Sequence, residues 1–148
     1  MTNLECFAAY AADFEKTFKD DDWSRLERYF AADATYQVKG EPFATKLTGR
    51  DAIFKGIKKS LDGFDRKLAK RTLALVDGPT ERVDSVSFGW TATYTAPGAS
   101  PFVLRGRSTA RYRGDLIAEL VDEYPDGMDR EAGAWINAHA PGLNAAYV

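Results

Sequence analysis

Apolar residues in the first half of the chain recur with the period of an α-helix. They return every three or four positions in residues 4–18, again in the short segment 23–30, and a third time in 48–64. This spacing gathers apolar side chains on one face of a helix. Residues 33–40 are instead rich in β-branched and aromatic side chains, and a loop around Pro42 follows them. We therefore predict three helices, with one strand before the third.

From residue 65 onward the period changes to two, which is typical of β-strands. The segments 66–76, 82–96, 102–112 and 116–124 alternate in this way. Residues 77–81, with the sequence DGPTE, have the composition of a turn. The second half of the chain is therefore predicted to be a meander of four antiparallel strands.

Helices that come first and strands that follow are typical of an α+β domain. The chain has 148 residues, which is the usual size of one domain and enough to bury a core. We expect a single domain over residues 1–148, in which residues 128–148 form a tail or a short helix. A strongly curved sheet around helices leaves a cavity between the two layers.

Composition and charge narrow the classes of function. The formal net charge is −2, and Lys and Arg do not cluster as they do in proteins that bind nucleic acid or anionic membranes. No apolar run approaches the ~20 residues of a membrane span, and residues 1–16 carry acids where a signal peptide needs bases. The lone Cys6 excludes an internal disulfide and favours a reducing compartment. We expect a cytoplasmic protein with no nucleic-acid and no membrane partner.

Three stretches resemble one known superfamily. They are "DDDWSRLERYFAADATYQV", "LTGRDAIFKGI" and "YRGDLIAELVDEYPD", and together with the order of elements they resemble the nuclear-transport-factor-2-like superfamily, in particular its SnoaL-like branch. The resemblance covers roughly residues 4–127. It implies a cystatin-like α+β barrel, in which a curved antiparallel sheet wraps around N-terminal helices to form a cone with an internal pocket. It does not define an activity, because the superfamily includes cyclases, isomerases, dehydratases and epoxide hydrolases.

A carboxylate stands on the apolar side of the last predicted strand. Asp122 has the parity of Leu116, Leu120 and Tyr124, and the resemblance places that side in the pocket near Trp90. A carboxylate held against aromatic rings loses hydration, so we expect a raised pKa for Asp122. A carboxyl group tuned in this way can exchange protons near neutral pH, as general acid or base catalysis requires.

Two interpretations of Asp122 remain open from the sequence. In the first, Asp122 is a proton shuttle, and Tyr36 orients the substrate or stabilises a developing oxyanion. In the second, Asp122 is a structural group that pairs with Arg82 or Arg107, or caps the following turn. Tyr36 and Trp90 have the same alternative, because both can simply pack in the core.

Limonene-epoxide hydrolases, which belong to the same superfamily, match this chain only in part. They hold a water molecule with a Tyr and an Asn and deprotonate it through an Asp–Arg–Asp relay. Tyr36 and Asp122 match two of these positions, but Val38 stands at the Asn position and Thr91 at that of the second Asp. The similar "ERVD" at residues 81–84 lies about seven residues too early. Epoxide hydrolysis is therefore not the favoured reaction.

Three other activities of the superfamily need residues that this chain lacks. Ketosteroid isomerases place a catalytic Asp where this chain has Val38, and their first-helix Tyr falls on Phe14. SnoaL-type cyclases pair the last-strand Asp with a His, and that position falls near Ser108. The single histidine, His139, lies in the tail, which also argues against a dehydratase with paired histidines. One acid and several hydroxyls remain, enough for a cyclase-like or isomerase-like proton transfer without a cofactor.

The candidate site follows from these comparisons. We expect Asp122 and Tyr36 to be catalytic and the substrate to be a small hydrophobic molecule. No His, Cys and acidic residues cluster at ligand spacing, so we expect no metal and no cofactor. The expected substrate-binding residues are aromatic or aliphatic: Phe14, Val38, Phe54, Trp90, Tyr94, Leu104, Tyr112 and Tyr124. The alternative to an enzyme is a non-catalytic module that binds a ligand or assembles as a dimer.

The other face of the sheet is expected to carry a row of arginines. Arg105, Arg107, Arg111 and Arg113 have odd parity, and Glu119 and Glu123 on the next strand can pair with them across the sheet. Because sheet-to-sheet dimers are common in the superfamily that the chain resembles, we expect a homodimer through this convex face. The apolar tail is expected to cover the pocket of its own chain or to reach the partner.

Overall fold

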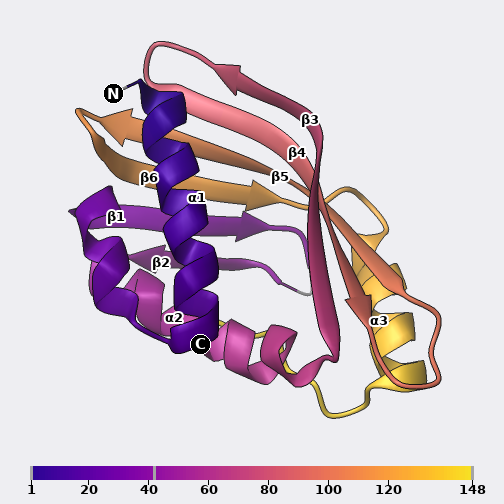
Figure 1. Cartoon of the computed structure of the whole chain (residues 1–148). Helices are drawn as coiled ribbons and strands as arrows, with labels where there is room; N and C mark the ends of the chain where they lie inside the picture. The colour runs from indigo at the N-terminus through magenta and orange to yellow at the C-terminus, as the bar shows by residue number, and fades with distance from the viewer. Residues whose placement is uncertain (1, 42, 148) are drawn as a thin grey trace.

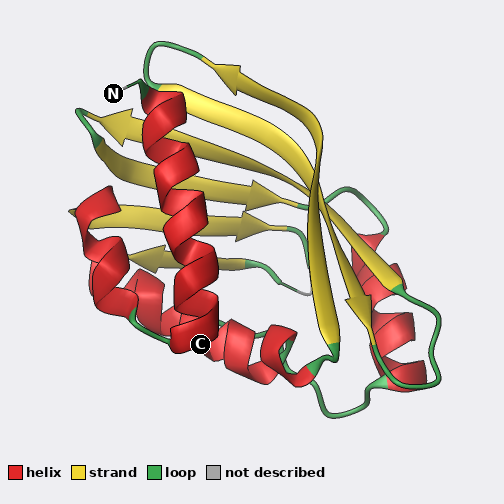
Figure 2. Ribbon diagram, viewed as in Figure 1, coloured by secondary structure: helices red, strands yellow, loops and turns green. Residues whose placement is uncertain are grey.

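Six strands form one curved sheet, and helices lie on its concave side (Figure 1). The computed structural model describes residues 2–41 and 43–147, so the predicted loop residue Pro42 lies outside the described part. Figure 2 shows how the helices gather on one side of the strands, with one more helix beyond the end of the sheet. The helical segments are α1 (Asn3–Asp20), η1 (Trp23–Tyr29), α2 (Arg50–Gly63), η2 (Asp65–Lys67) and α3 (Met128–His139). The strands are β1 (Phe30–Lys39), β2 (Thr45–Thr48), β3 (Lys70–Glu81), β4 (Ser85–Thr95), β5 (Phe102–Arg113) and β6 (Leu116–Glu123).

Helix α1 combines a strong start with an apolar inner face. The Thr2 hydroxyl accepts a hydrogen bond from the backbone N–H of Glu5, and the Glu5 carboxylate accepts one from the backbone N–H of Thr2. This reciprocal capping box satisfies two N–H groups that a helix start otherwise leaves unpaired. Phe7 and Tyr10 are buried on the side that faces the sheet. The helix predicted over residues 4–18 is confirmed, and it lies across the concave side of the sheet (Figure 1).

The sheet has the order β2-β1-β6-β5-β4-β3, and β1 with β6 is its one parallel pair among the described residues. Strands β3 to β6 are the predicted antiparallel meander. The α+β class is therefore confirmed, with a sheet that is mixed and mostly antiparallel. The parallel register places Tyr36 beside Leu120 and Val38 beside Asp122. This pairing brings the first strand next to the last one, where the candidate acid lies.

Two local predictions were wrong. Residues 45–48, expected to be loop up to a helix beginning at Thr48 or Gly49, form β2 and pair with β1. Residues 77–81, expected to be a turn, belong to β3, which lies at the edge of the sheet. The register of β3 against β4 shifts on both sides of Asp77, and Gly78 has a φ of 82°. An edge strand with such irregularities tolerates residues that a central strand would exclude.

A bulge changes which residues of β6 face inward. The pairing of β5 with β6 shifts between Arg111 and Tyr112, so that Tyr112 stands opposite Ile117. Ile117 is therefore fully buried, whereas Leu116 is 39% exposed. The prediction that Leu116 shares the inner face with Asp122 was wrong, because one shifted residue reverses the parity of a strand. Past the bulge, Leu120 and Asp122 keep the predicted inward direction.

The C-terminal segment folds back on its own chain. Residues 128–139 form α3, whose Trp135 stacks on Phe102 at the start of β5 with a ring-centroid distance of 5.5 Å. The chain then runs under α2, where the backbone N–H of Asn144 donates to the carbonyl of Gly63 over 2.9 Å. The segment after α3 therefore forms part of the wall on the concave side.

The arginine row on the convex face has other partners than those predicted. Arg107 and Arg111 stand opposite Glu123 and Glu119 in the register of β5 and β6. The ion pairs of the row instead reach acids of other segments, so the charge of each arginine is compensated within the chain. These pairs are Arg105 with Glu131, Arg107 with Asp77, Arg111 with Asp84 and Arg113 with Asp33.

Candidate functional site

A cavity of about 350 Å³ lies between the helices and the concave face of the sheet. Its wall combines residues of α1, α2, the C-terminal segment and every long strand. Leu73 and Leu75 of β3 line it although they are 47% and 57% exposed. The side chain of Glu15 on α1, also in the wall, is 40% exposed. These accessible side chains mark the side on which the cavity opens to solvent.

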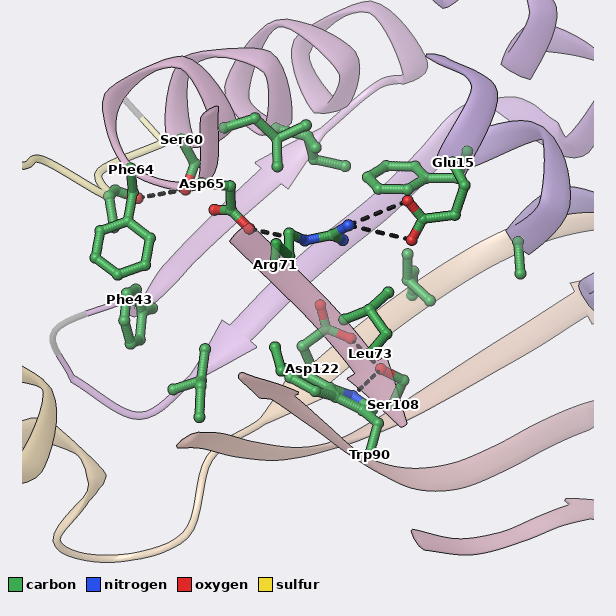
Figure 3. Close-up of a pocket in the computed structure, with 18 of the residues that line it drawn as sticks. Glu15, Phe43, Ser60, Phe64, Asp65, Arg71, Leu73, Trp90, Ser108 and Asp122 are labelled. Atoms are coloured by element: carbon green, nitrogen blue, oxygen red, sulfur yellow. Dashed lines mark hydrogen bonds and ion pairs between the residues drawn. The ribbon is translucent and has the colours of Figure 1, made fainter. Parts of the chain in front are cut away.

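Asp122 lies in the wall of this cavity at the centre of a hydrogen-bonded chain (Figure 3). The Tyr36 hydroxyl donates to Oδ2 over 2.6 Å, and the Ser108 hydroxyl donates to Oδ1 over 2.6 Å. Ser108 in turn accepts from the indole N–H of Trp90 over 2.9 Å. The sheet register creates part of this chain, because Ser108 on β5 stands opposite Asp122 on β6, and Trp90 reaches Ser108 from the neighbouring strand β4. Three separate strands thus fix the carboxyl group and its orientation.

The environment of Asp122 favours its protonated form. Burial raises the pKa of Asp122, and the hydrogen bonds from Ser108 and Tyr36 oppose that rise only in part. No Lys, Arg or His nitrogen within the described residues lies within 4 Å of the carboxylate. The predicted alternative of an ion pair with Arg82 or Arg107 was therefore wrong. A carboxyl group with neutral partners and a raised pKa is suited to take up and release a proton at moderate pH.

The predicted substrate-binding residues divide into two groups. Five of them lie in the wall of the cavity: Phe14, Trp90, Tyr94, Leu104 and Tyr124. Val38, Phe54 and Tyr112 are not among the residues that line it.

Each of the three remaining residues packs elsewhere for a structural reason. Phe54 points from α2 toward Phe30, whose ring centroid is 5.4 Å away, so it belongs to the core under η1. Tyr112 lies where the register of β5 against β6 shifts, and Val38 is buried in the core with 2% of its surface exposed. None of these three side chains borders the cavity, so their predicted contact with a substrate stays a prediction.

A second polar group in the wall was missed by the sequence analysis. Arg71 of β3 reaches Glu15 of α1, where Nη1 donates to both carboxylate oxygens over 3.1 Å. Its Nε lies 3.1 Å from Oδ2 of Asp65 but does not direct its N–H along that line, so this contact is an ion pair. The Tyr94 hydroxyl donates to the same oxygen of Asp65 over 2.9 Å. We call these four residues, Glu15, Asp65, Arg71 and Tyr94, the Arg71 cluster.

Tyr147, also missed, brings the C-terminal segment into the site. Its ring packs edge-on against that of Tyr36 with a centroid distance of 5.8 Å, and it lines the cavity. Burial raises the pKa of Tyr147, and the nearby charge of Asp122 adds to the rise. The Ser60 hydroxyl also donates to the carbonyl of Ala145 over 2.6 Å, which ties this segment to α2.

Residues 2–41 and 43–147 contain neither a metal-binding cluster nor a membrane-spanning helix. Within them, no group of three or more His, Cys, Asp or Glu side chains is arranged to hold a metal ion. No helix in this part of the chain has both the length and the apolar character needed to cross a bilayer.

Two solved structures have a fold similar to that of this chain. TerC, in crystals with polyporic acid, has a TM-score of 0.66 at 18% identity, over 91% of this chain and 98% of that one. An NTF2-like protein from Anabaena variabilis has a TM-score of 0.67 at 15% identity, over 86% and 92%.

A further similar structure also contains a small molecule. It is a protein with a ketosteroid isomerase-like fold from Catenulispora acidiphila in complex with trimethylamine, with a TM-score of 0.63 at 24% identity over 90% and 95%. No curated protein sequence matches the chain. The structural likenesses identify an NTF2-like fold. The model of the SnoaL-like domain matches residues 11–120, and the chain therefore belongs to the SnoaL-like family.

Proposed function

We propose that this SnoaL-like protein catalyses a cofactor-independent proton transfer, of the cyclase, isomerase or hydrolase type, on a small hydrophobic molecule. The observation that carries this proposal is the carboxyl group of Asp122 in the cavity wall, held by two neutral hydroxyls with a raised pKa. In the ionised form it takes a proton from an activated carbon, and in the protonated form it returns that proton elsewhere on the same molecule. The relatives that bind polyporic acid and trimethylamine support a small-molecule ligand.

Tyr36 has a narrower role than the one considered from the sequence. Its single O–H donor is directed at Asp122, so it is not free to stabilise an oxyanion while that bond persists. Tyr36 and Ser108 instead hold the two carboxylate oxygens and leave the group in one orientation toward the cavity. We therefore assign Asp122 as the proton shuttle and Tyr36 and Ser108 as residues that position it.

The test uses 5-nitrobenzisoxazole, an apolar probe that needs only a base. Asp122 takes the proton from its ring carbon, the C–H electrons form a nitrile, and the N–O bond breaks to give a coloured phenolate. We expect Asp122→Asn to lower the second-order rate constant by at least about 100-fold. Asp13→Asn is the matched control, because Asp13 also accepts a 2.6 Å hydrogen bond from a tyrosine but does not line the cavity. A wild-type rate no greater than that of Asp122→Asn would refute the proposal.

The competing function is a non-catalytic ligand-binding module. Both oxygens of Asp122 already have hydrogen-bond partners, as a purely structural carboxyl group would. This alternative predicts that the wild type binds apolar probes in the cavity but does not accelerate the reaction of 5-nitrobenzisoxazole. The proton-transfer proposal predicts both binding and acceleration.

A homodimer through the convex face is proposed with the same function. The charges of the arginine row are compensated within the chain, and Val103 on this face is 39% exposed. A face of this kind can pack against its own copy without unpaired charge. Sedimentation of a monomer at micromolar concentration would contradict it. A cytoplasmic location remains a prediction from the lone, buried Cys6, to be checked by fractionation.

A further inference from the structure

The guanidinium of Arg71 has one donor group that the protein does not use. Nη1 donates to Glu15 and Nε is paired with Asp65, whereas Nη2 has no hydrogen-bond partner among the described residues. Nε is completely enclosed, but Nη2 keeps accessible surface, and Arg71 lies in the cavity wall (Figure 3). An arginine presents five N–H donors, so two remain available here.

This donor is held in a fixed place. The guanidinium carbon lies 4.6 Å from the centre of the Phe18 ring, and the two carboxylates hold the group from either side. The Arg71 side chain is only 12% exposed. A donor fixed in advance costs little conformational entropy when a ligand binds, so it is well suited to select one oxygen atom of that ligand.

The surrounding charges decide which kind of oxygen it selects. The positive charge of Arg71 is already balanced by the carboxylates of Glu15 and Asp65, which lie on two sides of it. A further anion would meet two acidic groups within the same cluster and would be repelled. A neutral acceptor, such as a ketone or quinone carbonyl, accepts the hydrogen bond without that repulsion.

The Arg71 cluster and the Asp122 group lie at different levels of the sheet. In the register, Arg71 stands opposite Tyr94, whereas Ser108 beside Asp122 stands opposite Phe88. Between these levels the wall is apolar and includes Trp90 and Ala92. A ligand that reaches both groups therefore has an apolar body with its carbonyl oxygen away from the reacting carbon.

We infer that the Arg71 cluster is a second polar subsite of the cavity, which binds a neutral carbonyl oxygen of the substrate through Nη2. The inference rests on the proposed small-molecule function and specifies its substrate class, an apolar molecule that carries a ketone or quinone remote from the position of proton transfer.

The test compares two probes of similar shape, in which the carbonyl oxygen of one is replaced by a methyl group in the other. Dissociation constants of 2-acetylnaphthalene, a ketone, and of 2-isopropylnaphthalene, its hydrocarbon counterpart, are measured by calorimetry. We expect the wild type to bind the ketone about tenfold more tightly, which corresponds to one hydrogen bond to a charged group. Arg71→Met should abolish this preference and leave the affinity for the hydrocarbon within about twofold.

Arg66→Met is the matched control. Arg66 also stacks on Phe18, at 5.5 Å, and also pairs with two acids, Asp21 and Asp62, but it does not line the cavity. This variant should keep the tenfold preference for the ketone. Asp122→Asn should also keep the tenfold preference for the ketone, because the ketone oxygen binds at Arg71 and not at Asp122.

A second variant covers the case in which Arg71→Met does not fold. Glu15→Gln keeps Arg71 and removes one of the balancing charges, at a side chain that is 40% exposed. It should bind the anion 2-naphthoate several-fold more tightly than the wild type does. An unchanged affinity for 2-naphthoate would overturn the charge argument.

The outcomes separate this inference from the proposed function. If both probes bind the wild type equally, the subsite is refuted and the cavity is still a small-molecule site. If the preference disappears in Asp122→Asn but persists in Arg71→Met, the carbonyl binds beside Asp122, and only the inference fails. If neither probe binds the folded wild type, the small-molecule function fails and the inference fails with it.

Discussion

Two tyrosine–aspartate pairs in this protein have hydrogen bonds of the same length, but the pKa of the aspartate is shifted in opposite directions. Tyr29 donates to Asp13 and Tyr36 donates to Asp122, in both cases over 2.6 Å. Hydrogen bonds from Tyr29 and Lys16 lower the pKa of Asp13, whereas burial raises the pKa of Asp122. A tyrosine hydrogen bond alone therefore does not decide whether the pKa of a carboxyl group is raised or lowered.

The difference comes from what surrounds each pair. Asp13 lies on α1 at the edge of the fold, and Lys16 on the next turn of the helix supplies a positive charge 2.9 Å away. Asp122 lies on β6 inside the cone, and its second hydrogen-bond partner is the neutral hydroxyl of Ser108, whereas the second partner of Asp13 is the charged Lys16. Lys16 stabilises the charged form of Asp13, whereas desolvation disfavours the charged form of Asp122, so Asp122 is the better proton acceptor.

The largest difference between the two pairs is expected in the pKa values of their carboxyl groups. Carboxyl-carbon NMR should give Asp122 a pKa above the unperturbed value of about 3.9 and Asp13 a pKa below it. Asp122→Asn and Asp13→Asn assign the two signals. A pKa of Asp122 at or below about 3.9 would remove the basis of the acid–base proposal and leave a binding or structural module.

A smaller contrast is expected in the pH dependence of stability. Because its pKa is raised by folding, Asp122 contributes stability that is complete below about pH 3.9 and is lost as the pH rises through its folded pKa. Asp13, with a lowered pKa, contributes stability that is present above about pH 3.9 and is lost as the pH falls through its folded pKa.

The two variants should therefore diverge in urea unfolding between pH 3 and pH 8. Relative to the wild type, Asp122→Asn should become more stable as the pH rises, and Asp13→Asn should become less stable. A difference between Asp122→Asn and the wild type that does not change with pH would mean that the Asp122 pKa is the same in the folded and unfolded chains.

The smallest difference is expected in the free energy of unfolding when the hydroxyl of Tyr36 or of Tyr29 is removed. Tyr36→Phe leaves the part-buried Oδ2 of Asp122 without its donor, so we expect it to lower the free energy of unfolding by about 1–2 kcal/mol. Tyr29→Phe should cost less, because solvent and Lys16 can replace the lost donor at Asp13. Chemical denaturation at pH 7 measures both. Equal losses would indicate that Asp122 is better hydrated than its place in the cavity wall implies.

Much of the site was predictable because it depends on strand parity. Asp122 and Tyr36 were found from alternation and resemblance, and Phe14, Trp90 and Tyr94 lie in the cavity wall as expected. Parity failed at Leu116, where the register shifts, because a bulge is a property of two paired strands and leaves no periodic signal in one of them. The turn at 77–81 was predicted from composition and was wrong, because an irregular edge strand accepts the same residue types.

The Arg71 cluster was not predictable in the same way. Glu15, Asp65 and Arg71 come from α1, η2 and β3, and each resembles an ordinary surface charge in its own segment. Ser108 had been noted only as a departure from a family pattern, yet it links Trp90 to Asp122. No spacing along the chain connects such residues, because the curvature of the sheet brings them together.

The sequence by itself determined the order and type of most elements, the α+β class, and the presence of one carboxyl group on an apolar face. These properties follow from local periodicity and composition, which are encoded within each segment. The tertiary structure decided that Asp122 has two hydroxyl partners and no cation, that Arg71 borders the same cavity, and that Tyr147 closes part of its wall. Hydration and charge at a site depend on which distant segments come within a few ångströms, and only the folded arrangement specifies that.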